Sequence, residues 1–177
     1  MRAWRAVAAV SVWSALAVPA VGQPVSTDVL DLEWGTAPWA VVQAYPDAQC
    51  FGERSSLSDW RCILTDANVN DISVDVVLYG YRTGKAPGLA GVVLGFDSAD
   101  VHRILEAFVA RYGRWSRVAE HDFVTKAEKP FRSAIWLWNL PNVEIRVEQD
   151  RGTLGHGQAT IMYIAGLEEL RAREGTW

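Results

Sequence analysis

The sequence predicts an α+β fold, a two-layer sandwich in which two helices lie on one face of an antiparallel sheet of about six strands. Two helical patterns are each followed by three strand-like segments, so a helix-β-β-β unit is repeated twice. Short connections between successive strands favour antiparallel hairpins. A helix with one apolar face needs a sheet to cover, so both helices are expected on the same face.

The first helix is expected over residues 36–46, TAPWAVVQAYP, after an extended lead-in. Thr36 is a candidate N-cap, Pro38 suits the first turn and Pro46 ends the helix. Glycines in the third of the strands that follow, GLAGVVLGFD, suggest close packing or a bulge. The three strands are expected over 59–65, 71–84 and 88–97.

The second helix is expected over 98–113, where apolar residues follow i, i+3, i+4, i+7 spacing. Asp97 or Ser98 caps it, and Gly113 suits a left-handed stop. The next strands are expected over 132–141, 142–150 and 157–166, before a short terminal helix over 167–175. In the middle strand of these, alternation places Val143, Ile145 and Val147 inward and Glu144, Arg146 and Glu148 outward.

The first 22 residues have the pattern of a secretory signal peptide. Arg2 and Arg5 precede an apolar run of about 13 residues, and Pro19 and small residues follow. The run is shorter than the ~20 residues that a spanning helix needs. We therefore expect residues 1–22 to be removed and 23–177 to form a single α+β domain, periplasmic or secreted, with no membrane span.

Cys50 and Cys62 are the two cysteines of the chain. An exported chain meets an oxidising environment, where two cysteines usually pair. A zinc site needs four ligands, and a thioredoxin-like centre needs C-x-x-C; the segment offers neither. The sequence therefore predicts a structural disulfide, which should contribute roughly 3 kcal/mol in the chain-entropy model.

Composition and motifs argue against several classes of function. The 17 basic and 21 acidic residues give a net charge of −4, which disfavours nucleic-acid binding. The metalloprotease, nucleophile-elbow, phosphate-loop and dinucleotide fingerprints are missing from the sequence. No cofactor is expected.

The alternative hypothesis, that the protein is an enzyme, depends on its histidines. His102 is expected on the polar side of the second helix, in solvent. His121 and Asp122 are adjacent in a polar stretch, and His156 lies in a glycine-flanked turn. Together they would serve a small periplasmic hydrolase or metal-dependent enzyme.

Trp136 and Trp138 lie two residues apart in IWLWN, so they share one face of their strand. Either both lie in the core under the helices, or both lie on the open sheet face as an aromatic binding surface. Ile135 and Leu137 then take the opposite face. The alternation does not choose between these arrangements, because both faces are apolar.

The stretch LEWGTAPWAVVQAYP resembles the opening helix of small periplasmic proteins of the β-lactamase-inhibitor-protein-like fold. The small lipoprotein of the β-barrel assembly machinery has a related layout. The shared local motif is Trp34-Gly35 followed by Thr36 and a short helix, and the element order agrees over residues 32–165. The resemblance implies a binding or scaffolding role outside the cytoplasm. This chain lacks a lipidated cysteine, so membrane anchoring and membership of the assembly machinery do not carry over.

From these observations we expect an exported, non-enzymatic binding or scaffold protein. Its partner would be a protein or a small ligand on the sheet face, with Trp136 and Trp138 as candidate binding residues.

Overall fold

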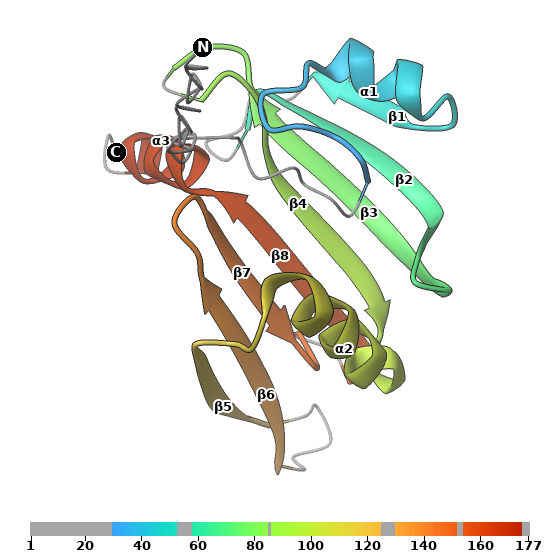
Figure 1. Ribbon diagram of the computed structural model, residues 1–177, viewed down its shortest axis with the longest axis vertical. Coiled ribbons are helices and arrows are strands. Elements are labelled where there is room, and N and C mark those ends of the chain that lie inside the picture. The colour runs from blue at the N-terminus through green and yellow to red at the C-terminus, as the bar shows by residue number, and fades with distance from the viewer. Residues whose placement is uncertain (1–29, 53–57, 85, 125–129, 152–153, 175–177) are drawn as a thin grey trace, which may run out of the picture.

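The computed structural model describes residues 30–52, 58–84, 86–124, 130–151 and 154–174, and the expected signal peptide lies outside them. Two units, each a helix followed by four strands, succeed one another before a terminal helix (Figure 1). The helices are α1 (Pro38–Ala44), α2 (Val101–Tyr112, after a 3-10 turn at Ser98–Asp100) and α3 (Ile164–Glu174). The strands are β1 (Gln49–Gly52), β2 (Trp60–Val69), β3 (Ile72–Tyr81), β4 (Gly88–Asp97), β5 (Arg117–Val124), β6 (Pro130–Asn139), β7 (Val143–Glu148) and β8 (His156–Tyr163).

All eight strands belong to one antiparallel sheet in the order β1-β2-β3-β4-β8-β7-β6-β5. Each unit is a meander, and its last strand lies at the centre of the sheet. The two meanders join where β4 pairs with β8, from Gly91 opposite Met162 to Asp97 opposite His156. The fold class is thus α+β as expected. The described residues form eight strands where the sequence indicated about six, and the helix that follows the two sandwich helices, α3, is the terminal helix expected over 167–175.

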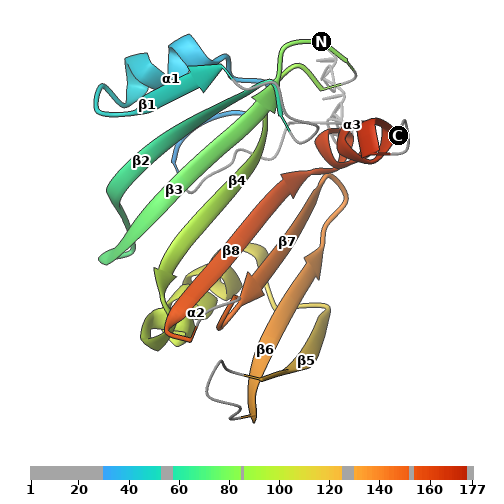
Figure 2. The same cartoon turned by 180° about the vertical axis from the view of Figure 1, so that it is seen from behind.

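The strand register divides the sheet into two faces, because directly opposed residues of an antiparallel pair point the same way. Leu78 is opposed to Val92, and Val92 to Ile161. These three side chains are buried in one core with Val41 of α1 and Phe108 of α2. The face that α1 and α2 cover is called the inner face below, and the opposite one the outer face. In Figure 2 the sheet lies in front of α2, so the outer face is toward the viewer.

Helix α1 begins at Pro38, which occupies the first turn as expected. Thr36 does not cap it: the N-cap is Ala37, and the Thr36 hydroxyl instead donates to the Glu33 carbonyl at 2.6 Å. The helix ends at Ala44, where the Tyr45 N–H bonds the Val41 carbonyl at 2.8 Å.

Helix α2 confirms the amphipathic pattern of the sequence. Its buried residues are Val101, Ile104, Leu105 and Phe108. The Asp97 carboxylate accepts from the Ala99 N–H at 2.9 Å at the start of the preceding turn, and Gly113, with φ of 76°, forms the C-cap.

Helix α3 packs against the end of the outer face. Tyr81 and Tyr79 lie two residues apart in β3 and so share that face. The Tyr81 hydroxyl donates to the Gly166 carbonyl at 3.4 Å. The Arg173 guanidinium lies 4.4 Å from the Tyr81 ring centroid and forms a bidentate ion pair with Asp59 at 2.9 and 3.2 Å. These contacts fix α3 to the beginning of β2.

Cys50 and Cys62 form the predicted disulfide. They are directly opposed in the β1–β2 ladder, so the bond joins two neighbouring strands. Strand β1 had not been expected from the sequence, and neither had β5.

The glycines of β4 carry both features that the sequence suggested. Tyr79 pairs with Gly91 and the next residue, Gly80, pairs with Leu89, so β4 has one extra residue, a bulge, at this point. Gly91 is closely packed, because a Cβ there would overlap the Tyr79 ring.

Candidate functional site

A row of side chains crosses the outer face over six strands. The register opposes each member to the next: Ile63, Val77, Val93, Thr160, Arg146 and Leu137. Arg146 is exposed, and the other five, four of them apolar, are half-buried. We call this set the outer row. Figure 2 shows from this side the six strands that carry it, β2, β3, β4, β8, β7 and β6.

Charged side chains of β7 lie on both sides of the outer row. Glu144, Arg146 and Glu148 point outward and Val143, Ile145 and Val147 are buried, as the alternation predicted. The Arg146 Nε lies 2.6 Å from the Glu148 Oε1. Glu148 is nonetheless largely buried, so this carboxylate is held in place against the sheet.

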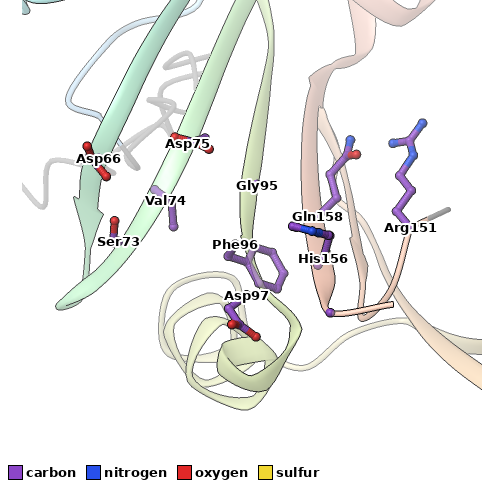
Figure 3. A pocket seen from close by; sticks show the side chains of 12 residues that line it. Asp66, Ser73, Val74, Asp75, Gly95, Phe96, Asp97, Arg151, His156 and Gln158 are labelled. Atoms are coloured by element: carbon purple, nitrogen blue, oxygen red, sulfur yellow. The ribbon is translucent and has the colours of Figure 1, made fainter. Parts of the chain in front are cut away.

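A hollow of about 390 Å³ adjoins the outer row at the ends of β3, β4 and β8. Ser73 and Asp75 of β3 form one wall, and His156 and Gln158 of β8 form the other. Between them Gly95 of β4 lies opposite both Asp75 and Gln158 and contributes no side chain (Figure 3). We call this depression the Gly95 hollow.

The Gly95 hollow is acidic. Asp66, Asp75 and Asp97 contribute three carboxylates from three strands, and among the lining residues that the structure describes Arg151 is the one arginine or lysine. In Figure 3 Asp66 and Asp75 lie on the side opposite Arg151. At neutral pH the lining therefore carries an excess of negative charge.

The register of β6 with β7 decides which face of the sheet Trp136 and Trp138 occupy. Trp136 is opposed to Val147 and Trp138 to Ile145, so both tryptophans lie on the inner face. Trp138 is 1% exposed, packs beside Phe108 with ring centroids 5.9 Å apart, and donates its indole N–H to the Gly113 carbonyl at 2.8 Å.

Trp136 is half-buried against the same core. Ile135 and Leu137 accordingly lie on the outer face, where Ile135 is buried and Leu137 half-buried. The outer face therefore carries an aliphatic pair at this strand instead of an aromatic one.

The structure does not bring together the three residues of the enzymatic hypothesis. His121 and Asp122 are consecutive in β5, so their side chains leave opposite faces of the sheet. Asp122 accepts from the Arg132 guanidinium at 2.9 Å. His156 begins β8, three strands from β5, which is about 14 Å at normal strand spacing.

Metal chemistry receives no support from the described part of the chain. Within it, no three His, Cys, Asp or Glu side chains lie close enough to hold an ion. His102 is exposed on α2, as expected, and His121 and His156 are exposed as well.

Two further hollows flank β2 on the inner face and share Asn68. One, of about 520 Å³, lies between the β2–β3 turn and α2, and the other, of about 420 Å³, lies between β2 and the end of α1. Tyr112 lines the first and Tyr45 the second, and burial is the main cause that raises the pKa of each phenol. Both phenols are thus neutral at physiological pH.

Sequence reasoning missed the residues of the Gly95 hollow. In the sequence Gly95 is one of several glycines of its strand, and no local pattern marks Asp75 or Gln158 as residues of a site. Because these residues lie on β3, β4 and β8, their proximity depends on the β4–β8 pairing, which no local pattern signals.

Comparison with protein-family models, with curated proteins and with solved structures finds no match. None of the helices in the described ranges has the length and apolar character needed to cross a membrane.

Proposed function

We propose that the chain is an exported, non-enzymatic binding protein whose outer face docks a protein partner. The observation that supports this proposal is the outer row. In an antiparallel sheet with one solvated face, outward positions are normally polar. Here Ile63, Val77, Val93 and Leu137 point outward across the sheet and remain partly accessible. Ile63, Val77 and Val93 are neighbours in the register, and Leu137 lies beyond Thr160 and Arg146. Accessible apolar side chains that gather on a sheet face mark interaction surfaces.

Two features support export. The disulfide between Cys50 and Cys62 suits an oxidising compartment. The first 22 residues have the charge and hydropathy pattern of a cleavable secretory signal. We therefore propose that the protein acts in the periplasm or outside the cell.

A binding role also suits the charges around the outer row. Arg146 of β7 separates Thr160 from Leu137 in the row, and the Gly95 hollow places carboxylates beside its middle members, Val77 and Val93. Mixed apolar and charged surfaces of this kind dock proteins with defined orientation, because charge fixes the register while apolar contact supplies affinity.

Site-specific photocrosslinking tests the proposal. A benzophenone side chain replaces Thr160, in the outer row, and in a second variant it replaces Ala110, which is exposed on α2. Irradiation of the cells that produce the protein should give a discrete adduct from position 160 and none from position 110. Mass spectrometry then identifies the captured partner.

A matched pair of variants supplies the control for folding. Thr160→Arg places a bulky charge in the outer row, and Ala110→Arg adds the same group to the opposite surface. The first should abolish copurification of the captured partner and the second should retain it, with both proteins folded by circular dichroism. Equal adducts from both positions, or equal loss from both variants, would contradict docking through the outer face.

A further inference from the structure

Gly95 is not explained by the packing of the sheet. A Cβ on Gly157, the nearby glycine of β8, would overlap the Phe96 ring, and a Cβ on Gly91 would overlap the Tyr79 ring. A Cβ on Gly95 would meet only Asp75, at 3.8 Å, which is ordinary van der Waals contact. Its φ is not positive either, so the fold would accept alanine at this position.

A glycine that neither packing nor φ requires still weakens a strand, because it loses more chain entropy on folding than alanine and buries nothing. Glycines within strands also occur where a ligand or another chain approaches closely. Gly95 lies in β4, a central strand of the sheet, and keeps open the floor of a hollow of about 390 Å³. The glycine at this position therefore indicates that a ligand or a group of another chain fills the hollow above it.

The lining defines the chemistry of that occupant. Asp75, Gln158 and Ser73 surround the floor with oxygen acceptors, and the carboxylates of the lining outnumber its single arginine. The described carboxylates are too widely spread to hold a metal ion. An ammonium or guanidinium group suits such a hollow, since it carries positive charge and several N–H donors.

The place of the hollow indicates how the cation arrives. Asp75 lies two residues from Val77 and Gln158 two residues from Thr160, so the hollow continues directly from the outer row. A flexible apolar stem that ends in a cation would follow Val93 into the hollow, as lysine and arginine side chains do. A free small cation would leave the apolar row uncovered.

We propose that the Gly95 hollow receives a lysine or arginine side chain of the protein partner that docks on the outer face. This inference rests on the proposed function and specifies the residue type that the partner presents. Gly95 makes room for the head group, and Asp75 supplies the principal counter-charge.

Titration of the oxidised protein with ethylguanidinium chloride, followed by amide NMR shifts, tests the chemistry of the hollow. Saturable shifts are expected at Asp75, Gly95 and Gln158, and neither sodium chloride nor sodium acetate should reproduce them. The shifts should disappear in Gly95→Val and persist in Ala110→Val, which adds bulk on the exposed side of α2, away from the hollow. Shifts that survive Gly95→Val, or that sodium chloride reproduces, would overturn the proposal.

Crosslinking from position 160 then separates this inference from the proposed function. Gly95→Val should lower the yield of the partner adduct at least about tenfold, which corresponds to 1.4 kcal/mol. Gly95→Ala should leave the thermal midpoint equal to or above that of the parent, which shows that the strand itself tolerates a side chain at this position. A lower adduct yield in folded Gly95→Val then comes from filling the hollow.

An unchanged adduct yield in a folded Gly95→Val protein would refute the hollow as a contact and leave outer-face docking intact. If ethylguanidinium binds but no adduct forms from the outer face, the claim that a partner's lysine or arginine occupies the hollow would be refuted. The hollow would then be a site for small cations. Loss of both signals in Gly95→Val would support the inference.

Discussion

Replacement of Trp138 by alanine should be among the most destabilising single changes in this protein. The side chain is 1% exposed, lies between Phe108 of α2 and Trp115, and donates its N–H to the Gly113 carbonyl. Truncation of a buried tryptophan costs about 3–5 kcal/mol. Trp136 is half-buried on the same face, so Trp136→Ala should cost about half as much.

Urea unfolding at constant pH, followed by circular dichroism, measures these differences. With a slope of about 2 kcal/mol per molar urea, Trp138→Ala should lower the midpoint by about 2 M. Trp138→Phe should cost about 1–2 kcal/mol, because it loses the hydrogen bond and part of the ring volume. Trp39 is 71% exposed on α1, and Trp39→Ala should change stability by less than about 1 kcal/mol. A Trp138→Ala cost no greater than that of Trp39→Ala would show that β6 does not pack as described.

Three further outcomes are expected. The hydrogen bond from Arg173 is the main cause that lowers the pKa of the Asp59 carboxyl, so the parent should exceed Asp59→Asn in stability above the unfolded pKa of about 4. That advantage should shrink as pH falls through the folded pKa, and a constant gap between pH 7 and pH 2 in unfolding titrations would contradict it. Cys62→Ser should cost roughly 2–4 kcal/mol, and the oxidised parent should weigh about 2 Da less than its reduced form by mass spectrometry; free thiols in native material would exclude the bond. Gly157→Ala should lower the thermal midpoint, because its Cβ overlaps a phenylalanine ring, whereas Gly95→Ala should not; equal midpoints would contradict the packing described for these neighbouring strands.

Elements whose patterns are strong and local could be predicted from the sequence. The boundaries of β4 agree with the expected 88–97, and α2 lies within the expected 98–113. Strand β1 was not predicted because it has four residues and no buried face. Strand β5 was not predicted because polar and apolar residues do not alternate in AEHDF, and its position at the sheet edge leaves Glu120, His121 and Asp122 exposed.

The candidate site was less accessible to prediction than the fold. Alternation correctly separated the two faces of β7, but it could not assign a face to Trp136 and Trp138, because apolar residues occupy both sides of β6. That choice depends on the β6–β7 register. The hollow depends in turn on β4 meeting β8, whose paired residues lie 59 to 71 residues apart in the chain. Pairing at long range is a property of the whole sheet and leaves no trace in a window of ten residues.

The junction of the two meanders at β4 and β8 has a consequence for biosynthesis. When the first unit has emerged, β4 presents ten residues, Gly88–Asp97, with one edge unpaired, and several of them are β-branched or aromatic. The backbone groups of that edge form their hydrogen bonds only after β8, His156–Tyr163, has been synthesised. Until then it can template pairing with another nascent copy, the usual origin of strand-swapped dimers. A chain cut after α2 should therefore associate through β4, and chaperones that shield strand edges should matter most for this protein during the synthesis of residues 113–155.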